Sequence, residues 1–342
     1  RENKDLFSQI FLRTEALKEV KKRNIYFLIG EKGTGKTAYA VYMTNNYDDR
    51  IKSIHKFIRE TDYRKFISLR ESRHLLVSDY VDIWKCILLL MVCGSLIEDP
   101  ERYNIKKNGN QFNKIKSIIE EYYRKAFSPE IVYGLQAIEN IEHIISIAKK
   151  FNFLEGGYDY KKGKSVSKDT KEFQTSISEL NRAFCESLSE LKLTSDFCLF
   201  VDGIDIRPDN VPFTEYLDCV KGLANAAWNL NNDIFPSFRD ANGRIRIILL
   251  LRPDIYNSLG LQNRNTKLKD NSIVLDWRTN YRLYRQSDLF QMADKFLSAQ
   301  QDTFPPPGVS WDHYFPFNAK GFSSDAEELS SFILVLRYTY HR

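Results

Sequence analysis

The sequence feature that constrains this chain most is a glycine-rich loop set between an apolar run and a helical pattern. The run, residues 25–29, reads Ile-Tyr-Phe-Leu-Ile, which is typical of a strand buried on both faces of a parallel sheet. The loop follows at once, and a helix is predicted over residues 36–43. A strand, a glycine loop and a helix in direct succession form the context in which backbone N–H groups bind phosphate.

The loop has the spacing Gly-x-x-x-x-Gly-Lys-Thr. Its glycines let backbone N–H groups turn inward around the phosphates of a nucleotide. Lys36 supplies a charge for those phosphates, and Thr37 supplies a hydroxyl for Mg²⁺. The alternative, a glycine turn followed by a chance Gly-Lys-Thr, is disfavoured by the flanking strand and helix patterns. The predicted nucleotide-binding residues of the loop are Gly30, Glu31, Lys32, Gly33, Thr34, Gly35, Lys36, Thr37 and Ala38.

A second apolar run, residues 197–201, ends in Asp202 and is typical of a Walker B strand, in which a carboxylate orients Mg²⁺. Asp202 is therefore the second predicted metal ligand, beside Thr37. Many ATPases place a catalytic acid directly after this aspartate, but here that position is Gly203. Asp205 is the candidate for the missing acid, and a turn-forming aspartate is the alternative. We expect turnover to be slow or to need a group from elsewhere.

A third apolar run, residues 245–251, ends in Arg252. The carboxyl edge of an open α/β sheet lies near the ligand crevice, where Arg252 can sense the γ-phosphate. The alternative is a surface ion pair with Asp254, and the two are weighed equally. After a fourth run, residues 272–277, three arginines are candidates for arginine fingers or for a solvated basic face: Arg278, Arg282 and Arg285.

Strands that alternate with helices predict an α/β fold with a doubly wound, mainly parallel sheet and a large helical insertion. The weakly periodic stretch before residue 73 has its best strand candidate at residues 65–69. Thr14 and Ser287 are predicted helix caps. The helices expected outside the loop region are residues 15–22, 79–97, 128–145, 173–191 and 212–230.

These patterns divide the chain into four predicted parts. Residues 1–97 and 193–303 form the two halves of a nucleotide-binding domain, and residues 98–192 form the helical insertion. Residues 304–342 form a tail that leads into a further domain. The chain begins at Arg1 and stops after an apolar stretch, so we expect a portion of a longer protein.

Composition excludes several classes of protein. With 43% hydrophobic and 28% charged residues the chain has globular rather than disordered usage. Its net charge of +5 implies no strong field, so a nucleic-acid partner is admitted but not indicated. The longest uncharged apolar run, residues 86–93, is short of the ~20 residues that span a bilayer, which predicts a buried helix and no membrane. Without a secretory signal pattern, a cytoplasmic location is expected.

Cysteine usage argues against a zinc site and a disulfide framework, because the chain has no C-x-x-C pair and no histidine at ligand spacing. We therefore expect reduced, buried thiols at Cys86, Cys93, Cys185, Cys198 and Cys219.

The base of the nucleotide is also constrained. Guanine recognition needs an Asn/Thr-Lys-x-Asp element after a strand, and residues 266–270 miss that spacing and precede a strand. Adenine, and thus ATP, is favoured.

The order of strand, glycine loop, long gap, strand ending in Asp202 and strand ending in Arg252 resembles the P-loop ATPases of the AAA, STAND and KAP group. The resemblance implies that Asp205 is the second acid of STAND and KAP members. It also implies that residues 11–17 are an upstream box in which Arg13 helps to hold the adenine.

A narrower resemblance is to a family of bacterial P-loop ATPases, and it covers residues 11–70 and 195–342. Some relatives in the wider group act in defence against phage, which the resemblance implies for this chain only loosely. The motifs that carry it are Val201-Asp202-Gly203-Ile204-Asp205, Leu251-Arg252-Pro253-Asp254, Leu275-Asp276-Trp277 and residues 336–342.

Three functions remain open on these grounds. The first is a Mg²⁺-dependent ATPase that acts as a switch or assembly module, hydrolysing ATP with Asp205 and with an arginine supplied by a homo-oligomer. The second is a nucleotide-gated oligomerising scaffold with little turnover, which binds protein partners through the helical region. The third is a nucleic-acid-stimulated motor, and the lysines that raise it, on a segment more typical of a solvated loop, are Lys161, Lys162, Lys164, Lys168 and Lys171.

Overall fold

The centre of the protein is a five-stranded sheet whose neighbouring strands are all parallel. The computed structural model describes residues 4–45, 50–58, 77–103, 109–126, 178, 181–207, 209, 211–238, 242–259, 270–279, 281–301, 303, 308–320 and 328–339. In the order β2-β3-β4-β1-β5, the strands are β2 (Ile51–Phe57), β3 (Asp196–Asp202), β4 (Ile245–Leu251), β1 (Phe27–Gly30) and β5 (Ser272–Leu275). The predicted α/β fold with a parallel sheet is confirmed.

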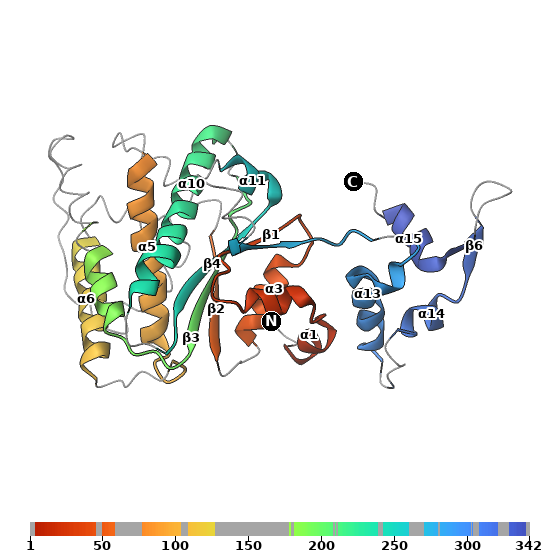
Figure 1. Cartoon of the computed structure of the whole chain (residues 1–342), viewed down its shortest axis with the longest axis horizontal. Coiled ribbons are helices and arrows are strands. Elements are labelled where there is room, and N and C mark those ends of the chain that lie inside the picture. The colour runs from red at the N-terminus through yellow and green to blue at the C-terminus, as the bar shows by residue number, and fades with distance from the viewer. Residues whose placement is uncertain are drawn as a thin grey trace.

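Helices surround this sheet (Figure 1). Those that precede β5 are α1 (Lys4–Ile10), α2 (Glu15–Val20), α3 (Lys36–Asn45), α5 (Val77–Glu98), α6 (Asn110–Ala126), α10 (Phe213–Asn229) and α11 (Pro253–Ser258). A π-turn, η2 (Leu230–Ile234), and a short η3 (Phe235–Ser237) extend α10. After β5 come η4 (Tyr284–Gln286), α13 (Asp288–Ser298), α14 (Ser310–Tyr314), β6 (Asn318–Lys320), β7 (Glu328–Ser330) and α15 (Ser331–Thr339).

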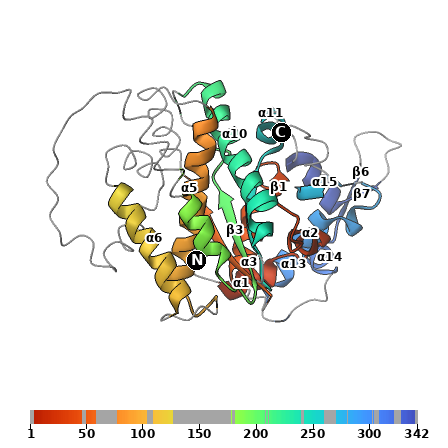
Figure 2. The same cartoon turned by 60° about the vertical axis from the view of Figure 1, so that its left-hand side comes forward.

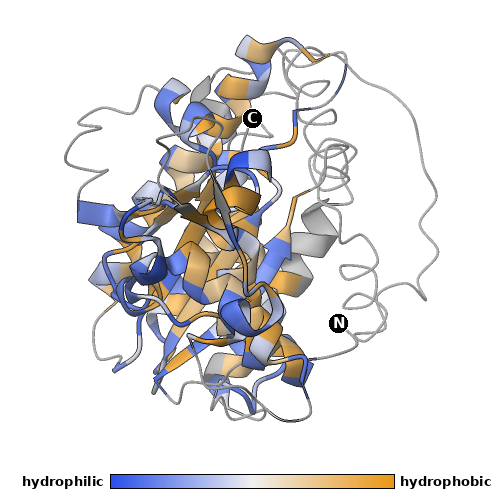
Figure 3. Cartoon of the chain, turned by 90° about the vertical axis from the view of Figure 1, so that its right-hand side faces the viewer, coloured by the Kyte–Doolittle hydropathy of each residue, from blue (hydrophilic) through white to orange (hydrophobic). Residues whose placement is uncertain are grey.

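The sheet separates two hydrophobic cores, as alternation along a strand requires. Leu249 of β4 belongs to the core beneath α5 and α10, whereas Leu250 belongs to the core beneath α1, α2 and α3. Every residue of β3 and β4 is buried, which explains why most of their positions are apolar. Figure 3 shows the hydrophobic residues gathered on these inner strands and the helices against them.

Helices α5 and α10 lie side by side on one face of the sheet, with α6 outside them (Figure 2). A Cβ on Gly222 would lie 2.6 Å from the Cβ of Tyr80, so the glycine permits their close approach. By length and composition the stretch Tyr80–Glu98 of α5 is apolar enough to cross a membrane, yet 78% of its most apolar window is buried inside the protein. This burial accounts for the composition and confirms the predicted buried helix.

The strand that we placed at residues 65–69 lies outside the described residues, so it stays a prediction. Strand β2 instead occupies Ile51–Phe57, which the prediction missed. It is an edge strand, hydrogen-bonded to β3, and its exposure alternates: Ile51 is buried and Lys52 is half-buried. An edge strand of this kind has no continuous apolar run, so its sequence does not indicate a buried strand.

Smaller predictions had mixed outcomes. Ser287 caps α13, since its Oγ accepts a hydrogen bond of 3.3 Å from the backbone N–H of Phe290. Thr14 precedes α2 but does not cap it, because its hydroxyl bonds to that of Tyr39. Four of the five free cysteines are buried, and Cys185 is half-buried. The helix predicted over residues 128–145 lies outside the described residues, and residues 181–189 of the later one are helical.

The elements from α13 to α15 form a C-terminal unit with a hydrophobic cluster of its own, centred on Phe290, Trp311 and Phe332. In Figure 1 this unit lies to the right of the sheet and is joined to it by the segment after β5. Lys295 of α13 donates a 2.7 Å hydrogen bond to the carbonyl of Phe11, so the unit also contacts the N-terminal region.

Candidate functional site

The glycine loop, residues 30–37, joins the carboxyl end of β1 to α3, and its glycines are there for steric reasons. A Cβ on Gly30 would lie 2.2 Å from Thr34 Oγ1. Gly33 and Gly35 have φ angles of +89° and +86°, in the left-handed region that other residues rarely adopt. The hydroxyl and the N–H of Thr34 both donate to Glu31 O, at 2.8 and 3.2 Å, which closes a tight turn.

Lys36 is held inside this loop. Its Nζ donates to the carbonyls of Gly30 and Glu31, at 2.6 and 3.2 Å, and lies 3.4 Å from Asp205 Oδ2. The side chain of Lys36 is only 8% exposed. The loop therefore carries a desolvated positive charge, fixed by two carbonyls and one carboxylate.

Asp202, the last residue of β3, meets Thr37 of α3. Thr37 Oγ1 donates a 2.6 Å hydrogen bond to Asp202 Oδ2, and the N–H of Gly203 donates to Oδ1 at 2.7 Å. His55 Nε2 lies 3.3 Å from the same Oδ2. Burial opposes the ionised form, but the hydrogen bonds from His55, Thr37 and Gly203 outweigh it, so the pKa of Asp202 lies below its usual value.

This donor set fits Mg²⁺. A hydroxyl and a carboxylate side by side are hard oxygen donors, and Mg²⁺ is commonly held by one or two such groups together with phosphate oxygens and water. Within the described ranges, no group of three or more His, Cys, Asp or Glu side chains is arranged to hold a metal ion. Thr37 and Asp202 are therefore the residues that could hold the ion.

Gly203 occupies the position at which many ATPases have a catalytic acid, and the structure explains why it is a glycine. Its φ is +84°, and an added Cβ would lie 2.1 Å from the carbonyl oxygen of Ile58. The N–H of Ile58 donates to Asp202 O at 2.8 Å, which continues the β2–β3 pairing to this point. The close approach of the two strand ends leaves no room for a side chain at position 203.

Asp205 is turned toward the glycine loop. Oδ2 faces Lys36, and Oδ1 accepts a 2.9 Å hydrogen bond from the N–H of Arg252. The hydroxyl of Tyr216 donates to the carbonyl of Ile204, which anchors the turn. Burial raises the pKa of Asp205, and Lys36 and the N–H of Arg252 oppose that rise. The residue thus has a site partner in addition to its place in a turn.

Arg252 forms the ion pair with Asp254 that was the alternative prediction for it. Its backbone N–H contacts Asp205 at the site, while its guanidinium pairs with Asp254, the Nη2 to Oδ2 distance being 2.9 Å. The side chain is 37% exposed. Contact of this guanidinium with a γ-phosphate remains a prediction.

The remaining candidate residues have other recorded contacts. The guanidinium of Arg13 lies 5.8 Å from the ring centroid of Tyr42 on α3, so its contact with an adenine stays a prediction. Arg278 pairs with Asp276 and Arg285 with Asp312. The five lysines of residues 161–171, and residues 266–269 of the tested guanine element, lie outside the described residues.

Two residues at the site were missed from sequence. His55 lies on β2, the strand that was itself missed. Trp277, directly beyond β5, donates its indole N–H to the carbonyl of Thr34 at 2.8 Å. The two are 243 positions apart in the chain, so no local pattern signals the contact.

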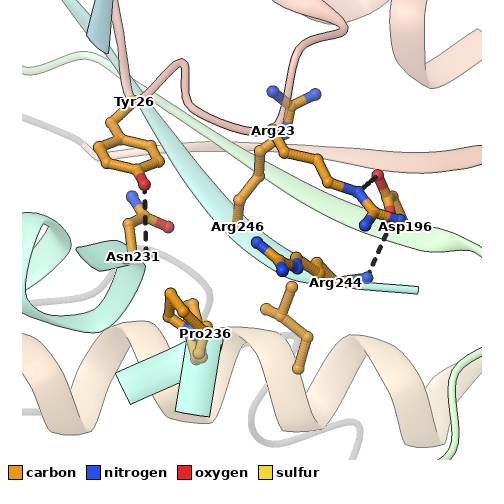
Figure 4. Close-up of a pocket in the computed structure, with 9 residues that line it drawn as sticks. Arg23, Tyr26, Asp196, Asn231, Pro236, Arg244 and Arg246 are labelled. Carbon is orange, nitrogen blue, oxygen red and sulfur yellow. Dashed lines mark hydrogen bonds and ion pairs between the residues drawn. The ribbon is translucent and has the colours of Figure 1, made fainter. Parts of the chain in front are cut away.

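The opposite edge of the sheet carries a different polar cluster (Figure 4). Arg23 donates to Asp196 through Nε and Nη2, at 2.9 and 2.7 Å, and the N–H of Arg244 donates to the same carboxylate at 2.9 Å. They line a cavity of about 20 Å³ beside a wider cleft of about 550 Å³. Because Asp196 begins β3 and Asp202 ends it, this cluster lies a strand length from the glycine loop.

Comparison of the chain with models of protein families, with curated proteins and with solved structures found no match. The case for a function therefore depends on the geometry of the site.

Proposed function

We propose that the protein binds ATP with Mg²⁺ in the glycine loop and hydrolyses it, as a P-loop ATPase whose domain carries a helical insertion. The observation that carries the proposal is a double contact: Thr37 with Asp202, and Lys36 with Asp205. It brings the phosphate-binding loop together with two acids. Asp202 is suited to bind a metal ion, and Asp205 is suited to orient a water molecule. The parallel sheet supports it, since such sheets bind ligands beyond the carboxyl ends of their strands.

Each residue then has a distinct task. The backbone N–H groups of the loop and the Lys36 ammonium bind the β- and γ-phosphates. Thr37 and Asp202 would hold Mg²⁺, which neutralises charge on the phosphates. Asp205 orients a water and accepts its proton as the water oxygen bonds to the γ-phosphorus and the bond to the bridging oxygen breaks. The products are ADP and phosphate. Arg252, or an arginine from a second copy of the chain, stabilises the charge that develops.

We further propose that the hydrolysis cycle drives a switch or an assembly step in the bacterial cytoplasm, and defence against phage is the biological setting favoured by the resemblance. The buried, paired Lys36 supports this reading. Its partner Asp205 follows β3 and is also hydrogen-bonded to Arg252, the first residue beyond β4. Phosphate binding at Lys36 would therefore change contacts at the ends of both strands.

The test is nucleotide binding by calorimetry, with ATP and Mg²⁺, for the wild type and for Lys36→Ala. Removing the buried ammonium is expected to weaken ATP binding by at least about a hundredfold, since charge-assisted contacts to phosphate are lost. The control is Lys22→Ala, which removes an exposed lysine paired with Glu19. Equal affinity of all three proteins for ATP, each shown to be folded by circular dichroism, would contradict the proposal.

A nucleotide-gated scaffold with little turnover is the second candidate, and one observation favours it. Both oxygens of the Asp205 carboxylate already have partners, Lys36 on one and Arg252 on the other. Oxygens that are already engaged in this way are less available to orient an attacking water. Assembly on addition of ATP, measured as mass in solution, together with negligible phosphate release would favour the scaffold over the ATPase.

A further inference from the structure

The segment directly after β5 contacts the glycine loop from outside. Trp277 Nε1 donates a 2.8 Å hydrogen bond to Thr34 O, near the middle of the loop. The other polar groups of Thr34 are turned inward to Glu31. The indole therefore binds the Thr34 carbonyl, which the loop's own turn does not use.

The backbone around Trp277 is fixed by a local turn and by the β1–β5 ladder. Asp276 Oδ1 accepts from the N–H of Arg278 at 2.9 Å, and Oδ2 accepts from Arg278 Nε at 2.6 Å. One residue earlier, Leu275 pairs with Gly30 in the β1–β5 ladder. The start of the loop and the base of the Trp277 turn thus share one register, so the ring is presented to Thr34 by the sheet.

Trp277 differs in its burial from the tryptophans that are packed in hydrophobic cores. Trp84 and Trp311 are buried in hydrophobic clusters and donate to Cys219 O and Ser331 Oγ. Trp277 is only half-buried and belongs to none of the clusters formed by the described residues. Burial of apolar surface does not account for its position, whereas the hydrogen bond to the loop does.

We propose that Trp277 is a positioning residue that holds the glycine loop in its phosphate-binding shape before the nucleotide arrives. A loop with glycines at positions 30, 33 and 35 has wide conformational freedom, and ordering it on binding reduces affinity. A donor fixed by the sheet lowers that loss. The inference rests on the proposed function, since ATP is the ligand for which the loop would be held.

The experiment compares Trp277→Phe, which keeps a ring but removes the donor, with Trp228→Phe as the matched control. Trp228 lies on α10, edge-on to Tyr26, away from the loop. Loss of one hydrogen bond predicts an ATP affinity about three- to tenfold weaker in Trp277→Phe, with kcat at saturation within about twofold of the wild type. The Trp228 variant is expected to bind ATP as the wild type does.

Tryptophan emission gives a second readout that a merely structural role would not move. The chain has four tryptophans, and the change in emission on adding ATP is expected to disappear in Trp277→Phe and to persist in Trp228→Phe. Trp277→His, which retains a ring N–H, is expected to recover part of the affinity. It also serves as the test variant in the event that the phenylalanine protein does not fold.

The outcomes separate this inference from the proposed function. A wild-type protein that binds no ATP overturns both. A wild type that binds ATP, with Trp277 variants that match it in affinity and in the emission change, overturns the positioning role alone.

Discussion

Lys36 Nζ lies 3.4 Å from the carboxylate of Asp205, with both side chains largely withdrawn from solvent. The contact joins the glycine loop to the turn after β3, two segments far apart in sequence. It places an acid where position 203 cannot supply one, because the carbonyl of Ile58 occupies the space that a side chain there would need.

Replacing Asp205 by Asn is expected to separate binding from turnover. The amide keeps the shape and the acceptor for the N–H of Arg252, but it cannot take a proton from water, so phosphate release should fall by about a hundredfold or more. ATP affinity should be retained, since one negative charge near the phosphates is removed. Asp254→Asn, which alters the exposed partner of Arg252, is the control. Unchanged phosphate release in Asp205→Asn would exclude its catalytic role.

Gly203→Ala is expected to reduce the free energy of unfolding by at least about 2 kcal/mol, measured in urea without nucleotide. The φ of +84° and the contact with Ile58 O both oppose a side chain. Gly33→Ala is the matched control: its φ of +89° is similar, but nothing lies within 4 Å of the added Cβ. The control should therefore lose about 1 kcal/mol. Equal losses would show that the close approach at Gly203 is unimportant.

The cluster at the opposite edge is expected to stabilise the fold. Asp196→Ala removes the acceptor shared by Arg23 and Arg244, and the Asp196 side chain is 10% exposed. Loss of partners for these groups predicts a fall of about 1–3 kcal/mol in the free energy of unfolding. Glu19→Ala breaks the exposed pair with Lys22 and should change it by about 0.5 kcal/mol or less. If thermal and urea unfolding show the same stability for both variants, the cluster has no such role.

Cys185 is expected to react slowly with alkylating reagents at neutral pH despite being half-buried. Burial raises the pKa of this thiol to about 11, and Lys85 opposes the rise. At pH 8 the thiolate fraction is then about two hundredfold below that of a thiol in an unfolded chain. Labelling followed by mass spectrometry should show modification that increases steeply above pH 10. The denatured protein is the control, and rapid labelling of the folded protein at pH 8 would contradict the expectation.

The same raised pKa has a consequence for stability. The unfolded thiol loses its proton at a lower pH than the folded one, so this contribution is fully present below the unfolded pKa, near about 8.5. It is lost as the pH rises toward 11.

The central strands and the glycine loop were predictable because their patterns are local. Residues 197–201 of β3 are buried on both faces and so read as an uninterrupted apolar run, and Gly30, Lys36 and Thr37 occur at a spacing that phosphate binding requires. Asp202 was predicted as a metal ligand from its place at the end of such a run. These features depend on a few neighbouring residues, which a sequence displays directly.

The features that escaped prediction depend on contacts between distant segments. β2 is an edge strand with only one hydrogen-bonded neighbour in the described sheet, so basic residues interrupt its apolar positions and His55 went unnoticed. Trp277 was visible beyond β5, but its bond to Thr34 requires the sheet order that places β5 beside β1. The glycine at position 203 was read as a lost acid, when it is required by the approach of Ile58.

The sheet order has a consequence for how the protein is made. Strand β1 pairs with β4 and β5, and its first partner residues are synthesised roughly 220 residues later. At about 5 to 20 residues per second, this apolar strand waits for some tens of seconds before any neighbour in the sheet exists. A nascent chain that holds β1 unpaired for so long is a substrate for chaperones, and slow codons placed before β4 would lengthen that exposure.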